Sequence, residues 1–282
     1  MIRLHLGAHK TASTHLQHSL RRHRVALANA GLVWLDPDDL RGPPLNAGQL
    51  AESGDPALAA ALVARAGGAA VVSDENLLGS AHLRGARGDQ RLYPDADARL
   101  TRLLGATGWR GVALFLGVRD PAAFLASAYT QRLMSGRVSD FATYLDGADP
   151  AMLAWSDLAA RLLAVPGVTA LTVWRQEDYP AVWPDLMARM LPDGLGAGVA
   201  PLPQVVHPGM SAAAHAAFMA QVAAGTPPDG LARRLRRDLP KSPTRPGYRP
   251  FDATTRAASA AAYAVDMDRV ARLPGATLLR AG

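Results

Sequence analysis

The chain of 282 residues contains no cysteine, few aromatic residues and no long uninterrupted hydrophobic run. Without cysteine there is no disulfide, no thiolate metal site and no cysteine nucleophile. The longest apolar stretch, residues 57–72, is interrupted by Arg65 and by glycines, so we expect no membrane span. The chain reaches Gly7 and Lys10 too early to contain the apolar region of a signal peptide, so we expect a cytoplasmic protein.

Charged residues make up only 19% of the chain, whereas hydrophobic residues make up 49%. This balance suits a folded protein with a sizeable core, because disorder needs lower hydrophobicity and a larger charge imbalance. There is no internal repeat and no long linker, and the length fits one large α/β domain. We therefore expect a single domain over residues 1–282, with a mostly helical and basic C-terminal part.

The net charge of +6 favours anionic partners, and much of it lies between residues 233 and 249. The basic residues there, against the lone acid Asp238, are Arg233, Arg234, Arg236, Arg237, Lys241, Arg245 and Arg249. The arginines before Asp238 are equally well interpreted as a solvated helix face. Lys241 and Arg245 lie instead in a loop rich in proline and glycine, and loops often carry function. A nucleic-acid-binding protein is disfavoured, because this segment offers Tyr248 as its one aromatic residue for base stacking.

Short apolar runs alternate with helical patterns along much of the chain. The runs that predict strands are 2–6, 32–35, 69–73, 111–118 and 168–174. The helical patterns are 11–30, 95–106, a segment that begins at Pro121, 151–164, and most of the chain after residue 211, including 253–271. Strands that are almost entirely apolar are covered on both faces. The pattern therefore predicts an α/β fold, with a parallel sheet of about five strands flanked by helices on both faces.

The most informative stretch joins the first strand to the first helix. Gly7 and Lys10 lie in the connection, and the hydroxyls of Thr11, Ser13 and Thr14 open the helix. Unpaired N–H groups at a helix N-terminus carry partial positive charge and bind phosphate, to which a lysine adds a full charge. A simple capped turn between strand and helix needs one hydroxyl and no lysine, so the combination indicates a phosphate-binding loop.

This loop is not a Walker A motif, because that motif needs glycine directly before the lysine and His9 stands there. It resembles the 5′-phosphosulfate-binding loop of the PAPS-dependent sulfotransferases, usually K-[ST]-G-[ST]-[ST]. Bacterial members are the most similar, since their motif begins H-x-G-x-x-K-T and ends in L-Q, as residues 5–17 do here. Ala12 stands where the family usually has glycine; its methyl group is tolerated at a helical φ but crowds the phosphate at a positive φ.

A second motif strengthens this resemblance. The strand at 111–118 leads into Arg119, and Ser127 follows after seven residues, which looks like the family's 3′-phosphate-binding element. An arginine fork suits a phosphate dianion, although an Arg119–Asp120 pair that caps the next helix is the alternative. The segments 73–76 and 173–179 are similar to the family's S-x-E-N and Y-E-D-L segments. The resemblance thus covers residues 1 to about 180 and implies a P-loop-like fold.

The resemblance implies a role for each matching residue. PAPS is the co-substrate, PAP is the product, and no metal is expected. Lys10 stabilises the bridging oxygen and the leaving phosphate, while Arg119 and Ser127 hold the 3′-phosphate. Lys241 and Arg245 belong to a basic segment that closes over the nucleotide. The residues expected at the 5′-phosphosulfate are Gly7, His9, Lys10, Thr11, Ala12, Ser13 and Thr14.

An acceptor hydroxyl also needs a general base. Glu75 is the first candidate and Asp74 the second, because both follow the strand at 69–73, whose carboxyl end faces the substrate crevice. The alternative is that Glu75 caps a helix or pairs with an arginine. His9 and His82 are further candidates for the general base.

The acceptor itself is not specified by these motifs. A carbohydrate or a small metabolite with a hydroxyl or amine is compatible with the sequence, and the positive charge suits an anionic carbohydrate. The irregular segments 36–48 and 79–94 are expected to shape its pocket, and Gln131 and Arg132 are either acceptor contacts or ordinary helix positions. Two rival functions remain: a small-molecule kinase that uses ATP and Mg²⁺, and a relative that binds the nucleotide without turnover.

Overall fold

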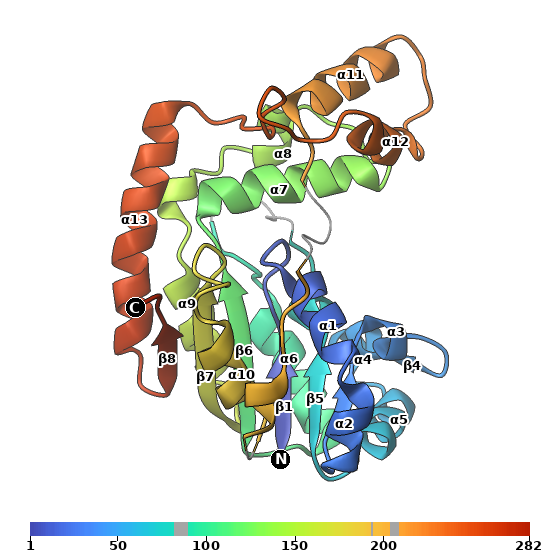
Figure 1. The fold of residues 1–282 in the computed structure, drawn as a ribbon, viewed down its shortest axis with the longest axis vertical. Helices are drawn as coiled ribbons and strands as arrows, with labels where there is room; N and C mark the ends of the chain where they lie inside the picture. Colours follow the sequence, from blue (N-terminus) through green and yellow to red (C-terminus); the bar gives the residue numbers. More distant parts are fainter. Residues whose placement is uncertain (82–89, 193, 204–208) are drawn as a thin grey trace.

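The computed structural model describes residues 1–81, 90–192, 194–203 and 209–282 and is built around one parallel sheet (Figure 1). Six strands lie in the order β2-β5-β1-β6-β7-β8, and every neighbouring pair is parallel. The strands are β1 (Ile2–His5), β2 (Val33–Leu35), β5 (Ala70–Ser73), β6 (Val112–Val118), β7 (Val168–Arg175) and β8 (Ala276–Leu279). Two further strands, β3 (Arg41–Gly42) and β4 (Leu45–Asn46), form a small antiparallel pair.

Helices form the connections between these strands. The α-helices are α1 (Ser13–Arg21), α2 (Arg24–Asn29), α3 (Pro37–Leu40), α4 (Ala47–Ser53), α5 (Pro56–Ala66), α6 (Ala96–Thr107), α7 (Pro121–Met134), α8 (Phe141–Leu145), α9 (Trp155–Leu163), α10 (Trp183–Met190), α11 (Ala212–Ala223), α12 (Leu231–Asp238) and α13 (Ala253–Arg272). Three short 3₁₀ helices are η1 (Glu75–Leu78), η2 (Pro150–Met152) and η3 (Leu195–Gly198). None of the described helices is long and apolar enough to cross a membrane.

The sheet is covered on both faces, which confirms the predicted fold class. One core cluster joins the sheet to α4, α5, α6, α9 and α13. A second cluster joins it to α1, α2 and α10, with Leu16, Leu20 and Trp174 among its members. Alternate residues of the same strands enter different clusters, as Leu114 and Phe115 of β6 do. This is why the strands read as continuous apolar runs rather than as an alternation of polar and apolar residues.

The sheet has six strands, one more than the sequence predicts. The additional strand, β8, lies at the edge and pairs only with β7 in the described residues. It falls in the part of the chain that the sequence pattern assigns to helix. The break comes at Gly275, which adopts a φ of 83° after α13 and allows the chain to turn back along β7.

The helix predicted over 11–30 is in fact two helices, α1 and α2, with the break at His23. Four consecutive basic or partly basic residues, 21–24, occupy this point. Arg21 and Arg24 both turn to the acidic segment after β2, where Arg21 pairs with Asp36 at 2.8 Å and Arg24 pairs with Asp39. Separating the two helices lets both arginines reach carboxylates instead of repelling one another along one helix.

The carboxyl ends of β5, β1 and β6 meet beneath α7, which crosses above the sheet (Figure 1). The chain first runs from β1 outward to β2 and returns to β5, and then continues on the other side of β1 with β6. In open α/β sheets, ligands bind where the winding direction reverses in this way. Helices α11 and α12 pack on α7 through a third cluster that includes Tyr129, Phe218 and Leu235. They bring the basic C-terminal segment to the same end of the sheet.

Candidate active site

The loop between β1 and α1 continues the pairing of β1 with β6. The N–H of Leu6 donates to the carbonyl of Phe115 at 2.9 Å, and the N–H of Ala8 donates to that of Gly117 at 3.0 Å. Gly117 allows this close approach, because a Cβ at that position would lie 2.9 Å from the hydroxyl oxygen of Thr11. The Thr11 hydroxyl itself donates to the carbonyl of Ala8 at 2.5 Å, so it closes the loop. The loop is therefore held against the sheet from both of its ends.

The backbone of this loop has the shape of an anion cradle. Gly7, Lys10 and Ala12 have positive φ angles of 35°, 68° and 67°. Left-handed residues interspersed among others turn neighbouring N–H groups toward a common point, as in the anion-binding nests of other proteins. Ala12 is also the N-cap of α1, and no side chain caps this helix end. The first N–H groups of α1 are thus left for a ligand.

Two buried polar atoms without partners lie directly beneath the cradle. The hydroxyl oxygen of Ser13 and Nε2 of His5 have no hydrogen-bond partner in the part of the chain that the structure describes. A Cβ at Gly7 would lie 2.4 Å from the Ser13 oxygen and 2.9 Å from His5 Nε2, so only glycine fits between them. Burial lowers the pKa of His5 to about 4, so its ring is neutral. Ser13 is the hydroxyl of the loop that remains for a bound phosphate or sulfate oxygen.

The left-handed conformation of Ala12 leads to a stability prediction. A residue with a Cβ is strained at φ 67°, and glycine is not. We expect Ala12→Gly to raise the free energy of unfolding by about 0.5–1 kcal/mol. Ala8→Gly, in the same loop but without a positive φ, is the matched control and should lower it, because Ala8 is fully buried. Chemical denaturation of both variants measures the effect, and a less stable Ala12→Gly protein would contradict the strain at this position.

Lys10 lies in a cluster of positive charge. Burial lowers its pKa to about 8, and the nearby charges of Arg119, Arg236 and Lys241 act in the same direction. The negative charge of Glu75 acts in the opposite direction and raises the pKa of Lys10. Cations from three parts of the chain, the loop itself, the end of β6 and the segment around α12, are thus close enough to influence one another. Such a cluster is unfavourable unless an anion binds to it.

Arg119 follows β6 directly and points to the loop. Its Nη1 donates to the carbonyl of Lys10 at 3.3 Å, and the indole of Trp155 donates to the carbonyl of Arg119 at 2.8 Å. Among the described residues, no carboxylate lies within ion-pair distance of its guanidinium, and burial lowers its pKa. Asp120 caps α7 by accepting from the N–H of Ala123 at 2.9 Å, but it does not pair with Arg119. The arginine is therefore available to an anion rather than used as a helix cap.

The other predicted nucleotide contacts do not all lie near Lys10 and Arg119. The charge of Arg119 helps to lower the pKa of Lys241, which lies against Gly209 and Gly247 and belongs to the same cationic cluster as Lys10. No described contact places the side chain of Arg245 there; its backbone closes a small turn with Ser242. Ser127 lies on α7, where its carbonyl accepts from Thr130 at 3.0 Å, and no described contact joins its hydroxyl to Arg119. Thr14 lies in the first turn of α1.

Both candidate carboxylates for the general base pair with Arg41. Asp74 is fully buried, accepts from Arg41 at 2.6 Å and also caps η1. Glu75 is 15% exposed, lies 2.9 Å from the same guanidinium and accepts from Gln17 at 3.2 Å. Burial alone would raise the pKa of Glu75, but Arg41 and His9 together hold it below its ordinary value. Glu75 is thus ionised at neutral pH, and it is the more exposed of the two carboxylates.

His9 is fixed by two partners. The hydroxyl of Tyr93 accepts from the backbone N–H of His9 at 2.9 Å and lies 3.0 Å from Nδ1, while Asn76 Oδ1 lies 3.3 Å from Nε2. Burial raises the pKa of Tyr93, so its hydroxyl keeps its proton and donates it to Nδ1. Nε2 then carries the ring proton and donates to Asn76. His9 is neutral, since burial lowers its pKa, and His82 lies outside the described residues.

Sequence reasoning missed several residues that the structure brings to this site. Arg41 holds both candidate carboxylates, Tyr93 and Asn76 hold His9, and Arg236 contributes to the positive field at Lys10. Arg236 lies in the basic run, but nothing in that run distinguishes it from its neighbours. In the described part of the chain, no group of three or more histidine or acidic side chains is placed to hold a metal ion.

Comparisons with known proteins leave the family open. No protein-family model matches the chain, and no curated protein matches it. Among solved structures, it is similar to a sulfotransferase from Alicyclobacillus acidocaldarius. That match covers 86% of this chain and 96% of the other, with 15% sequence identity and a TM-score of 0.44. A likeness of this degree establishes no activity, so the function has to be argued from the residues of this chain.

Proposed function

We propose that the protein is a PAPS-dependent sulfotransferase, which moves a sulfuryl group from PAPS to a hydroxyl or amine of an acceptor. The observation that carries the proposal is the loop around Lys10, which has an uncapped helix N-terminus and a direct hydrogen bond from Arg119, with the charges of Arg236 and Lys241 close enough to lower the pKa of Lys10. Lys10 and Arg119 are partly buried and have no carboxylate within ion-pair distance among the described residues, which is costly in the free protein. A ligand with separate anionic groups compensates several of them at once, and PAPS carries a 3′-phosphate and a 5′-phosphosulfate.

The residues of the loop fit the 5′-phosphosulfate. The left-handed turns at Gly7, Lys10 and Ala12 expose backbone donors, and the Ser13 hydroxyl has no partner among the described residues. In the proposed complex, these donors, the Lys10 ammonium and the nearby Thr14 hydroxyl hold the phosphate and sulfate oxygens. Fixed donors aimed at a developing charge need no reorganisation during the reaction.

The 3′-phosphate is assigned to the other part of the cluster. Arg119 offers the forked donor set that phosphate prefers, and Ser127 lies two turns into the helix that follows it. Lys241 and Arg245 belong to the segment that we assign to closure over the nucleotide. A 3′-phosphate is absent from ADP and ATP, so these residues are proposed to select PAPS over both.

The transfer step exchanges one bond for another. The acceptor oxygen forms a bond to sulfur while the bond from sulfur to the 5′-phosphate oxygen breaks, and PAP leaves with that electron pair. Lys10 stabilises the charge that grows on the leaving oxygen. The proton of the acceptor hydroxyl passes to Glu75, which is ionised and partly exposed beside the loop. The products are a sulfate ester, PAP and one proton.

His9 has a positioning role in this scheme. Its Nδ1 accepts from Tyr93 and its Nε2 donates to Asn76, so the ring has no lone pair left to take a proton. In the sequence it occupies the position of the glycine before the lysine of a Walker A motif. The kinase alternative therefore has no specific observation in its favour.

Thermal stabilisation by PAP, ADP and ATP, with and without Mg²⁺, tests the proposal. A ligand that binds only the folded state raises the melting temperature, by an amount equivalent to about 2.7 kcal/mol at 100 times its dissociation constant. We expect strong stabilisation by PAP without Mg²⁺ and weak stabilisation by ADP. A response to ATP that requires Mg²⁺, with no response to PAP, would instead support the kinase. Release of PAP from PAPS in the presence of acceptors separates a sulfotransferase from a relative that only binds the nucleotide.

A further inference from the structure

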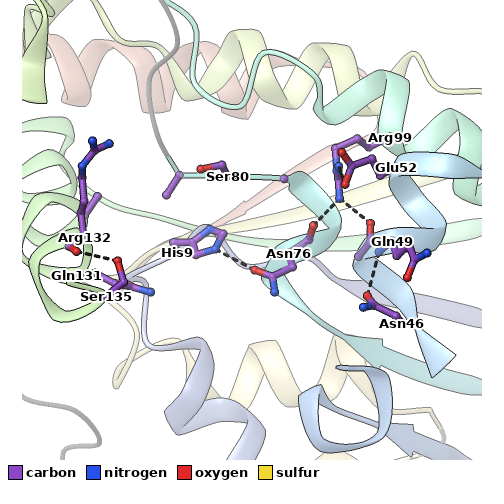
Figure 2. A pocket seen from close by; sticks show the side chains of 14 residues that line it. His9, Asn46, Gln49, Glu52, Asn76, Ser80, Arg99, Gln131, Arg132 and Ser135 are labelled. Atoms are coloured by element: carbon purple, nitrogen blue, oxygen red, sulfur yellow. Dashed lines mark hydrogen bonds and ion pairs between the residues drawn. The ribbon is translucent and has the colours of Figure 1, made fainter. Parts of the chain in front are cut away.

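A polar cavity adjoins the phosphate-binding loop. It has a volume of about 570 Å³, which lies within the range of roughly 300–1,000 Å³ typical of small-molecule sites. His9 forms part of its wall, so the cavity begins at the loop itself (Figure 2). Residues of α4 and η1 lie on one side of His9, and Gln131 and Arg132 of α7, with Ser135 just after this helix, lie on the other (Figure 2). Two of its lining residues, Asn46 and Gly48, belong to the expected acceptor segment 36–48, and the three residues 79–81 belong to the segment 79–94.

The walls of this cavity are more polar than apolar. Its lining residues are His9, Asn46, Gly48, Gln49, Glu52, Asn76, Gly79, Ser80, Ala81, Arg99, Ala128, Gln131, Arg132 and Ser135. Among the described residues that line the cavity there is no leucine, isoleucine, valine, phenylalanine, tyrosine or tryptophan. Small-molecule sites are usually lined mainly by apolar and aromatic side chains, which bind flat hydrophobic ligands. A phenol or a steroid would gain little by burial here.

Four side-chain amides of the cavity have unused hydrogen-bonding capacity. Gln49 and Gln131 make no side-chain hydrogen bond to any described residue. Asn46 and Asn76 each use the oxygen as an acceptor, from the Gln49 N–H at 3.0 Å and from His9 at 3.3 Å, which leaves their NH₂ groups as donors. Amides offer donors and acceptors side by side, as hydroxyl groups do. The cavity therefore matches a ligand that presents several hydroxyls.

The two arginines of the cavity differ in their partners. Arg99 is satisfied, because its guanidinium donates to the carbonyls of Leu77, Gly48 and Asn76 and lies 3.7 Å from Glu52. Arg132 has a buried Nε without a partner and no ion pair among the described residues. A cation left unpaired at the wall of a cavity is a site for an anionic group of the ligand.

We propose that this cavity binds the acceptor, and that the acceptor is a sugar or similar polyhydroxylated molecule with one acidic group that pairs with Arg132. The inference rests on the proposed sulfuryl transfer and adds the class of substrate to it. The amides hold the hydroxyls, Arg132 holds the acidic group, and one hydroxyl lies toward His9 and the loop. The substrate is oriented by these two contacts, because its acidic group binds Arg132 while the reacting hydroxyl lies toward the loop.

Acceptor preference tests this inference directly. The probes are methyl glucuronide, methyl glucoside and 4-nitrophenol, each with PAPS, and release of PAP is measured. We expect kcat/KM to be about 10- to 100-fold higher for the glucuronide than for the glucoside, and the phenol to be the poorest acceptor. Arg132→Gln should remove this preference by raising KM for the glucuronide, while KM for PAPS stays unchanged. Arg137→Gln, an exposed position just beyond α7 that does not line the cavity, should preserve it.

Binding measured by ligand-observed NMR in the presence of PAP gives a readout without turnover. Saturation transfer to the glucuronide that disappears in Arg132→Gln supports the inference. A preference for the phenol, or equal losses for both sugars in Arg132→Gln, would overturn it while leaving the sulfotransferase proposal intact, as would absence of glucuronide binding to a protein that PAP stabilises. Absence of stabilisation by PAP would instead overturn the proposed function, and the acceptor class with it.

Discussion

Arg119→Met is expected to weaken the binding of PAP by about 100-fold or more and to leave the free protein equally stable or more stable. The two effects have one cause. In the free protein burial lowers the pKa of this guanidinium, and the charges of Glu177 and Asp120 offset the effect only in part, so removing the charge relieves a cost of burial. In the complex it is proposed to donate to the 3′-phosphate, and each such charge-assisted bond is worth about 1.5–3 kcal/mol. Methionine fills a similar volume without the charge.

Arg175→Met is the matched control, because Arg175 ends the neighbouring strand β7 but has a partner. It donates to Asp178 at 2.6 and 2.8 Å, and Asp178 is only about a tenth exposed. Its loss should lower the free energy of unfolding by about 1–3 kcal/mol and leave PAP affinity unchanged. Calorimetric titration with PAP and ADP, together with denaturant unfolding, measures both quantities. Equal loss of PAP and ADP affinity in Arg119→Met would show that Arg119 does not bind the 3′-phosphate.

The strands around the site could be predicted from the sequence because each is a continuous apolar run buried on both faces. Strands β1, β5 and β6 lie within a residue or so of their predicted bounds. The edge strand β8 could not be predicted in this way, since it is short, only partly buried and supported by β7 alone among the described residues. It forms by pairing with β7, about 100 residues earlier in the chain, and no pattern in its own sequence indicates this pairing.

The candidate site could likewise be predicted only in part from the sequence. The loop around Lys10 could be identified because its features are contiguous: a strand, a glycine, a lysine and a helix start. Arg41 could not, since its ion pairs with Asp74 and Glu75 bridge more than 30 residues of sequence and depend on the β3–β4 turn. The charge of Lys241 influences Lys10 because α11 and α12 pack on α7, which is a property of the tertiary core rather than of the basic run.

The conformation of Ala12 shows a further limit of sequence reasoning. The sequence predicts only that alanine is tolerated if φ is helical, and the structure has φ 67° instead. The position thus keeps the backbone of a glycine while carrying a methyl group. The loop thus keeps a left-handed residue at this point at the expense of local strain.

Lys10→Met is expected to reduce kcat for sulfuryl transfer by about 100- to 1,000-fold, the effect of removing one donor aimed at a developing negative charge. Lys241→Met is the natural comparison, because Lys241 is the only other lysine in the chain. It should raise KM for PAPS and change kcat little, since it is proposed to close over the nucleotide and not to contact the leaving oxygen. Single-turnover measurements at saturating PAPS separate the two variants. Similar kcat values for Lys10→Met and wild type would remove Lys10 from the transfer step.

The pKa of Lys10 adds a pH dependence with a definite sign. In the free protein its pKa is lowered to about 8 by burial and by neighbouring cations, and a bound phosphate raises it again. Binding of PAP therefore takes up a proton above pH 8, and affinity should fall as the pH rises from 8 toward 10.5, by up to about tenfold per unit. Phosphate groups are already fully ionised in this range, since their second pKa is about 6, so the ligand contributes no slope. Lys10→Met should bind PAP more weakly at pH 7.5 and lose the slope, because the group that takes up the proton is gone. If wild type and variant keep the same slope up to pH 10, another group titrates and the lysine is not the one that contacts the phosphate.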